Sequence, residues 1–517
     1  MALGRARAVA LVGLNGHVVE VETHLAAALP AFTIVGLPDA SLSEARDRVR
    51  AAVASCSLAW PARRVTVNLS PASLPKAGSS FDVAIAVATL AAAGAIDHEA
   101  PVRVVHLGEL GLDGRVHPVR GVLPAVAAAV AAGCPRVVVA EGNAAEARLV
   151  QGADVVAVAH LAEVVLRYGG QVSQPDEVSS ERLVRGAVPR RDSSVTGREA
   201  RDLSDVLGQP EAREALEVAA AGGHHLLLVG PPGAGKTMLA ARLPGVLPDL
   251  SDREAVEVTS VHSVAGTLDA GDGLITRPPF EDPHHTATPA AIVGGGPGIP
   301  RPGAASRAHC GVLFLDEAPE FSPRVLETLR QPVEHGELVL HRARGAARYP
   351  ARFQLVLAAN PCPCGRGSGK ALECTCTPLV RRRYLARLSG PLLDRVDIQV
   401  DVPPLTRAAI ALAGPGESTA AVAERVRHAR RRAARRLRGT PWRSNVQVTG
   451  SWLRANPVPA VAAAGLDRAL DRGGISLRGV DRVLRISWTL ADLAGHEVPT
   501  REDVGRALAL RTRGQGG

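Results

Sequence analysis

The chain has 517 residues, of which 46% are hydrophobic, 21% charged and 3% aromatic, so its length allows about two to four domains with aliphatic cores. Its net charge of +9 lies after residue 170, and residues 378–443 alone hold 15 arginines against 5 acidic residues. We find no apolar run that predicts a membrane span, no signal-peptide pattern and no even set of cysteines typical of a disulfide framework, and therefore expect a cytoplasmic protein with no membrane partner.

The segments predict three domains and a linker. Residues 1–168 alternate Val/Ile/Leu runs with alanine-rich helical stretches, which indicates an α/β domain. Residues 169–203 are rich in Ser, Gly, Pro and charge, which is typical of a linker. Strand and helix patterns alternate again over 204–405. The remainder, 406–517, is predicted to be helical, with helices at 418–438, 458–471, 476–494 and 501–513.

A phosphate-binding loop follows the first buried strand of the 204–405 segment, within "HLLLVGPPGAGKTMLAARL". Its glycines let backbone N–H groups surround phosphate oxygens at a helix N-terminus. We expect the lysine to neutralise the β- and γ-phosphates of ATP and the threonine hydroxyl to bind Mg²⁺. The loop, called Walker A below, consists of Gly230, Pro231, Pro232, Gly233, Ala234, Gly235, Lys236 and Thr237.

Two acidic residues end a second buried strand, "GVLFLDEAPEF". Asp316 is expected to hold Mg²⁺, directly or through water, and Glu317 to polarise the attacking water. Burying two carboxylates without a cation would be costly, which favours a metal and nucleotide site.

Three further polar residues complete the predicted ATP site. Asn360 ends the strand "FQLVLAANP" and can orient the water against the γ-phosphate. Arg395, in "LSGPLLDRVDI", precedes another strand and can reach the γ-phosphate of a neighbouring subunit. Arg478 begins a C-terminal helix, from which it can sense nucleotide.

Four cysteines lie directly after Asn360, in "NPCPCGRGSGKALECTCTP". Two C-x-C pairs separated by nine residues can place four thiolates around one Zn²⁺. A redox pair and four reduced thiols in a surface loop are the alternatives. The candidate ligands are Cys362, Cys364, Cys374 and Cys376.

Taken together, these motifs resemble the YifB/ComM family of magnesium-chelatase-like AAA+ ATPases over nearly the whole chain. The supporting segments include "PHHTAT", "AHCGVLFLDEAPEFSPRVLETLRQPVEHGE", "NPCPCG" and "YLARLSGPLLDRVDI". The resemblance implies a P-loop α/β/α sandwich with a helical lid, a hexameric ring and, for ComM proteins, DNA branch migration. It also makes Asn360 sensor 1, Arg395 the arginine finger and Arg478 sensor 2.

The N-terminal domain resembles the proteolytic domain of Lon, with a ribosomal S5 domain 2-like fold. Ser80 stands at the position of Lon's nucleophile, but the position of its catalytic lysine holds Leu123 or Ala125. No lysine occurs between residues 77 and 235, and arginine cannot serve as the base. We therefore expect a protease-like fold without protease activity, in which Ser80 and Lys76 have structural roles.

The position of the arginines favours DNA as the partner. A hairpin is expected from Val339–His341 and a return strand near Gly345, and in this AAA+ branch such hairpins point into the ring pore. Arg342 and Arg344 would then contact phosphates, although a solvated hairpin tip is the alternative. The leading prediction is an ATP-driven DNA motor; a chelatase- or chaperone-like remodelling ATPase is the alternative, and an ATP-dependent protease is disfavoured.

Overall fold

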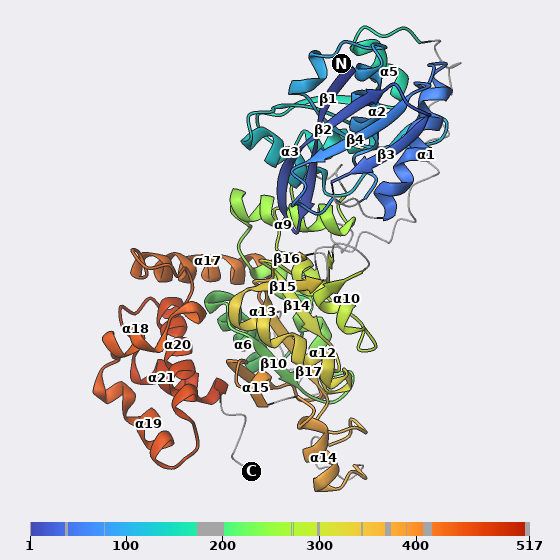
Figure 1. Ribbon diagram of the computed structural model, residues 1–517. Coiled ribbons are helices and arrows are strands. Elements are labelled where there is room, and N and C mark those ends of the chain that lie inside the picture. Colours follow the sequence, from blue (N-terminus) through green and yellow to red (C-terminus); the bar gives the residue numbers. More distant parts are fainter. Residues whose placement is uncertain are drawn as a thin grey trace.

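Figure 1 shows the computed structural model, with the N-terminal domain above the second domain and the C-terminal helices to one side. The second domain is called the ATPase domain below, and the C-terminal helices the lid, after the roles that the sequence predicts for them. The predicted linker at 169–203 falls mostly outside the described residues. None of the helices in the described ranges has the length and apolar character needed to cross a membrane. The structure describes residues 2–36, 40–76, 78–172, 201–269, 271, 273–296, 300–342, 345–367, 374–388, 390–406 and 416–511.

The N-terminal domain is built on a seven-stranded mixed sheet of order β3-β4-β2-β1-β5-β8-β9. Alternating burial along β2 and β4 directs one set of side chains into the core. Helix α2 is buried along its whole length, since it packs between the sheet and its neighbouring helices. The strands are β1 (Ala2–Val12), β2 (Asn15–Ala26), β3 (Ala31–Val35), β4 (Arg64–Ser70), β5 (Val105–Leu107), β8 (Arg136–Ala140) and β9 (Asp154–Val158), with the short pair β6 (Glu109–Leu110) and β7 (Val116–His117). The helices are α1 (Ala40–Ser55), α2 (Asp82–Ala92), α3 (Val122–Ala131), α4 (Ala144–Ala147) and α5 (Leu161–Arg167).

The ATPase domain is built on a five-stranded parallel sheet of order β11-β14-β17-β10-β18. Its inner strands are continuous apolar runs because separate hydrophobic clusters cover the two faces. The mixed α/β architecture predicted for this segment is therefore confirmed. The strands are β10 (Leu226–Val229), β11 (Phe280–Glu281), β14 (Val312–Leu315), β17 (Gln354–Ala359) and β18 (Ile398–Asp401). The helices are α6 (Pro210–Gly222), α7 (Lys236–Ala240), α8 (Leu243–Val246), α9 (Asp252–Ala265), α10 (Pro289–Val293), α11 (Ala304–Arg307), α12 (Pro323–Thr328), α13 (Arg330–His335), α14 (Pro378–Leu385) and α15 (Gly390–Leu393).

Two hairpins extend the ATPase domain. The predicted one is present as the antiparallel pair β15 (Glu337–Arg342) and β16 (Gly345–Pro350), while β12 (Gly294–Gly295) pairs with β13 (Arg301–Pro302). The β15–β16 hairpin lies against the N-terminal domain. Gly13 of the N-terminal domain approaches Arg348 of β16 so closely that a Cβ on Gly13 would lie 2.4 Å from the Arg348 carbonyl oxygen. Arg344, a predicted DNA contact, lies outside the described residues.

The C-terminal lid contains five helices in its described range: α17 (Thr419–Arg436), α18 (Gly450–Ala455), α19 (Ala460–Asp471), α20 (Leu477–Ala494) and α21 (Arg501–Arg511). The sequence predicted four of them and missed α18. The arginines of α17 mostly fasten the lid: Arg425 binds Glu217 with two hydrogen bonds, and Arg430 donates to the Ala220 carbonyl oxygen. Part of the local positive charge is therefore paired with carboxylates of the chain, as for Arg425 and Arg436.

The N-terminal domain contacts the ATPase domain through α3 and α9 (Figure 1). Buried Glu146 accepts hydrogen bonds from the Leu123 amide at 2.8 Å and from the Ser263 hydroxyl of α9. The Gly121 amide donates to the Ser263 carbonyl oxygen at 3.3 Å. A buried polar contact of this kind fixes the relative position of the two domains.

Candidate functional site

The Walker A loop, Asp316 and Asn360 meet at the carboxyl edge of the ATPase sheet, because they follow the parallel neighbours β10, β14 and β17. The Lys236 ammonium donates to the Gly230 and Pro231 carbonyl oxygens at 2.7 and 2.9 Å and to Asn360 Oδ1 at 3.1 Å. Burial lowers the pKa of Lys236, and the Asp316 and Glu317 carboxylates oppose that shift. Residues predicted from three separate motifs are thus brought together.

The two acidic residues differ in role. Asp316 Oδ2 accepts a 2.6 Å hydrogen bond from the Thr237 hydroxyl, and its other oxygen accepts the Glu317 amide at 2.9 Å. Glu317 itself has φ +50°, a left-handed backbone that costs a non-glycine residue about 1 kcal/mol or more. Its carboxylate lies 3.5 Å from His285 Nδ1. Asp316 therefore pairs with Thr237, whereas Glu317 lies near His285.

The loop residues fit a triphosphate. Gly233 and Gly235 have φ values of +76° and +93°, and a Cβ on either would meet nothing within 4 Å. The backbone is therefore open on the side where phosphate oxygens would lie, at the N-terminus of α7. The Thr237–Asp316 pair offers the hydroxyl and carboxylate oxygens that Mg²⁺ prefers.

An apolar cavity of about 170 Å³ lies beside the loop, and the sequence analysis missed it. Gln209 fixes one wall by donating to the Pro403 carbonyl oxygen at 2.6 Å. The cavity suits a planar purine base. Its residues come from three separate segments and have no shared motif; they are Asp205, Val206, Leu207, Gln209, Ala234, Gly235, Met238, Leu239 and Leu405.

Arg395 and Arg478 lie together in a second cavity of about 330 Å³ at the opposite edge of the sheet. Arg395 precedes β18, and Ile398 pairs in parallel with Leu226, so Arg395 lies at the amino ends of the strands while Walker A follows their carboxyl ends. Its guanidinium forms an ion pair with Glu334. The pKa of Arg395 is lowered, mainly by burial and also by the positive charge of nearby arginines. The cavity is lined by His225, Val333, Glu334, Asp394, Arg395, Val446, Arg478, Arg482 and Arg485.

A buried polar network holds this arginine cavity in place. Asp397 is fully buried and accepts from Arg482 at 2.5 Å and from His224 Nδ1 at 3.2 Å. Burial opposes ionisation, yet His224 and Arg482 hold the pKa of Asp397 well below its usual range. His224 Nε2 lies 2.8 Å from the Thr489 hydroxyl. Since Thr489 belongs to α20, the helix that begins beside Arg478, the network docks the lid on the sheet.

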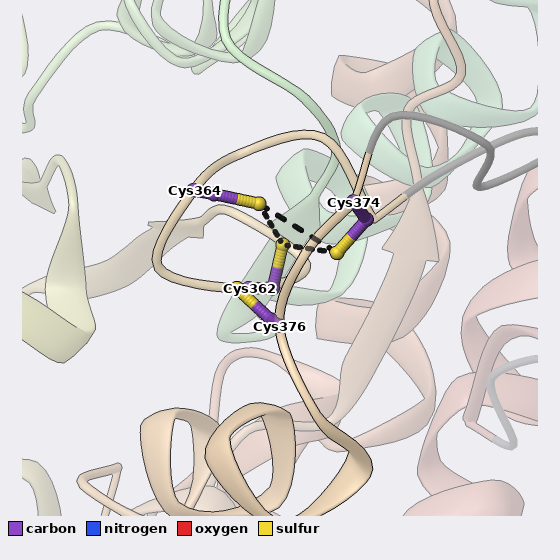
Figure 2. Close-up of side chains that lie close together, drawn as sticks. All are labelled: Cys362, Cys364, Cys374 and Cys376. Atoms are coloured by element: carbon purple, nitrogen blue, oxygen red, sulfur yellow. Dashed lines mark hydrogen bonds between the residues drawn. The ribbon is translucent and has the colours of Figure 1, made fainter.

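The remaining predicted residues divide into two groups. The four cysteines gather in one cluster (Figure 2), which lies directly after Asn360. In the N-terminal domain, Leu123 and Ala125 are buried apolar residues. Lys76 is buried, with its ammonium donating to the Pro71 carbonyl oxygen, and burial lowers its pKa. The structural role predicted for Lys76 agrees with this contact.

Helix α14 presents a basic face within the arginine-rich segment 378–443. Arg382 and Arg383 are exposed, and within the described ranges their guanidinium groups make no hydrogen bond or ion pair. Figure 1 shows α14 extending from the ATPase domain at the end away from the N-terminal domain. Unlike Arg425 and Arg430 of α17, these two remain available to an external anion, as do the exposed Arg431 and Arg435 of that helix.

Comparisons with known proteins cover nearly the whole chain. Three family models match: "Magnesium chelatase, subunit ChlI" over residues 202–410, "Subunit ChlI of Mg-chelatase" over 21–143 and "Magnesium chelatase, subunit ChlI C-terminal" over 416–511. The uncharacterized protein Rv2897c of Mycobacterium tuberculosis is 52% identical, over 99% of both chains. Competence protein ComM of Haemophilus influenzae and YifB of Escherichia coli are 40% and 39% identical, each over 97% of this chain and 96% of theirs.

A partial match supports the expected likeness to Lon. Lon protease 2 of Bacillus subtilis is 32% identical over 152 residues, which are 28% of this chain and 27% of the relative. The match agrees with the Lon-like fold expected from "PKAGSSFDVAIA".

Proposed function

Because the chain belongs to the YifB/ComM family of magnesium-chelatase-like AAA+ proteins, we propose that it is an ATPase whose active sites are shared between subunits of a hexameric ring. One observation carries this proposal: Arg395 and Arg478 share a cavity at the edge of the sheet opposite their own Walker A loop. Neither arginine can assist hydrolysis at its own P-loop from there. In a ring, that edge would face the nucleotide of the adjacent subunit.

Each residue of the carboxyl edge has a definite task. The Walker A amides and Lys236 bind the phosphates, and the apolar cavity receives the base. Mg²⁺, held by Thr237 and Asp316, supplies charge neutralisation of the β- and γ-phosphates when bound. Glu317 accepts the proton of the attacking water, with Asn360 orienting that water from beside Lys236.

The neighbouring subunit would supply the remaining positive charge. In the isolated chain Arg395 forms an ion pair with Glu334. In the ring, the Arg395 guanidinium would leave this carboxylate and bind the γ-phosphate of the nucleotide on the adjacent subunit. Arginine fingers of this type raise the rate of nucleotide hydrolysis by a factor of about 10³–10⁵. The location of Arg478 in the same cavity extends the prediction for sensor 2: it would sense the neighbour's nucleotide.

DNA is the proposed substrate of the motor, with branch migration as the activity that the family resemblance implies. Support comes from the name of the Haemophilus relative, "Competence protein ComM", and from the unpaired arginines of α14. Arg382 and Arg383 would contact phosphates and release counterions, so binding should weaken steeply with salt.

The test measures ATPase rate and binding with forked DNA at several salt concentrations. Arg382→Ala combined with Arg383→Ala should weaken DNA binding and make the slope of log K against log salt shallower by about 2. The matched control is Arg427→Ala with Arg506→Ala, which removes the same charge from arginines already paired with Glu424 and Glu214. If DNA neither binds nor changes the ATPase rate at low salt, the DNA motor is refuted.

A protein-remodelling ATPase is the second candidate. The buried contact of Glu146 with Ser263 favours it, because it links the Lon-like domain to α9 and would transmit motion from the motor. This candidate would be supported if the ATPase rate did not change with DNA but rose when an unfolded protein substrate was added.

A further inference from the structure

The four-cysteine cluster, consisting of Cys362, Cys364, Cys374 and Cys376, has the dimensions of a metal site (Figure 2). The sulfur of Cys362 lies 3.3 Å from that of Cys364 and 3.7 Å from that of Cys374, and the latter two are 3.6 Å apart. All four sulfurs lie within 4.8 Å of one another. Four sulfurs bound tetrahedrally at about 2.3 Å from one zinc ion would lie about 3.8 Å apart.

The same distances argue against the alternatives. A disulfide needs about 2.05 Å between sulfurs, and all four cysteines are free. Neutral thiols can hydrogen-bond at these separations, but four thiolates so close together would repel one another without a cation between them. An iron–sulfur cluster places inorganic atoms between the thiolates and needs a wider cage than sulfurs within 4.8 Å provide. A single tetrahedral ion fits best.

The loop that carries the cluster lies against the nucleotide site. Cys362, fully buried, comes two residues after Asn360. A Cβ on Gly365 would lie 2.7 Å from Cγ and Cδ of Pro232, so the loop touches the Walker A loop directly. A Cβ on Gly367 would lie 2.9 Å from the Cys362 sulfur, which shows how closely this loop folds around that residue.

The other end of the loop leads into α14. The Thr377 side chain caps α14 by accepting from the Val380 amide. On α14 the Tyr384 side chain is buried, and burial together with the Glu320 and Glu317 carboxylates raises its pKa to about 12. The cluster therefore ties the segment after Asn360 to the segment before Tyr384, with the ATP-binding elements on both sides.

We propose that the four-cysteine cluster binds one structural zinc ion, and that this ion holds the loop against Pro232 so that the ATP site keeps its shape. The metal site stands on the cysteine geometry alone, whereas the coupling to nucleotide rests on the proposed ATPase function. Binding would release the thiol protons and join the two C-x-C pairs through one ion. Loss of zinc would free the loop and loosen Asn360 and the Walker A loop together.

Metal analysis of the full chain, purified without added metal or chelating resin, tests the site. We expect about one zinc per chain in the wild type and in Cys310→Ser, a cysteine outside the cluster. Cys364→Ser and Cys374→Ser should each lose most of it. Zinc well below one per chain, iron in its place, or unchanged zinc in Cys364→Ser would overturn the metal site.

Binding of a fluorescent ATP analogue tests the coupling. The wild type is stripped with a chelator, its fold checked by circular dichroism, and zinc then restored, so the test does not depend on a variant folding. We expect stripping to weaken nucleotide binding about tenfold, as loss of supporting contacts around a site commonly does, and zinc to reverse the change. Unchanged binding after stripping would overturn the coupling.

A control separates this inference from the proposed function. Lys236→Ala should keep its zinc and lose nucleotide binding. If zinc is present but zinc-loaded wild type fails to hydrolyse ATP, the proposed function fails while the metal site stands.

Discussion

Replacing Asp397 with asparagine should destabilise the lid strongly, because the carboxylate is fully buried between Arg482 and His224. An asparagine side chain has nearly the same shape as aspartate but no charge. Its amide N–H group would face Arg482 or His224, each of which donates a hydrogen bond to Asp397. Two charge-assisted hydrogen bonds are affected, each worth about 1.5–3 kcal/mol, and breaking a buried pair costs about 3–5 kcal/mol. We expect a loss of about 3 kcal/mol in the free energy of unfolding.

Urea unfolding followed by tryptophan fluorescence measures this loss, because three of the four tryptophans, Trp442, Trp452 and Trp488, lie in the lid. With a urea dependence of about 2 kcal/mol per molar, the midpoint should fall by about 1.5 M. Asp467→Asn, an exposed position on α19, serves as the control and should change the free energy by less than about 0.5 kcal/mol.

The acid dependence provides a second check. Because the folded pKa of Asp397 is depressed, its contribution is fully present above the unfolded pKa of about 3.9 and is lost as pH falls toward the folded value. The difference between wild type and Asp397→Asn should therefore be constant near neutrality and shrink below about pH 4. Equal midpoints at pH 7 would refute the role assigned to this network.

Three further changes test the ATP site. Glu317→Gln should retain ATP binding while the turnover rate falls about 10²–10³-fold, since the amide cannot accept the proton; unchanged turnover would contradict this assignment. Gly235→Ala should weaken ATP binding, because the left-handed backbone costs about 1–2 kcal/mol and the methyl group would occupy the phosphate side, whereas Gly439→Ala, with a similar φ of +87° and open surroundings in the lid, should leave binding intact. Leu405→Trp should fill the apolar cavity and weaken ATP binding in a fluorescence titration, while Leu379→Trp on exposed α14 should not.

The residues on the carboxyl edge of the ATPase sheet were predictable from sequence because each follows its own buried strand. Gly230, Asp316 and Asn360 directly follow β10, β14 and β17, and parallel strands bring such ends together. The pairing of Lys236 with Asn360, 124 residues apart, follows from that topology. The cysteines were likewise predictable as a group, because their ligand type and close spacing are local features.

Features formed by distant segments were not predictable. The apolar cavity combines Val206, Met238 and Leu405, and no local pattern connects them. The shared location of Arg395 and Arg478 depends on how α20 docks through Thr489 and His224. Similarly, the charge of residues 378–443 suggested a polyanion surface, but tertiary pairing decides which arginines remain free: Arg425 is bound by Glu217, and Arg382 is not bound by any described residue.

A mixing experiment tests the shared active site most directly. Glu317→Gln and Arg395→Ala chains are each expected to hydrolyse ATP at least about 10²-fold more slowly than wild type when assayed alone. Co-assembled in equal amounts, about a quarter of the subunit contacts would join an intact Glu317 to an intact Arg395, so roughly a quarter of the wild-type rate should return. If the mixture stays as inactive as its components, or if Arg395→Ala alone hydrolyses ATP at the wild-type rate, each chain completes its own site and the account is wrong.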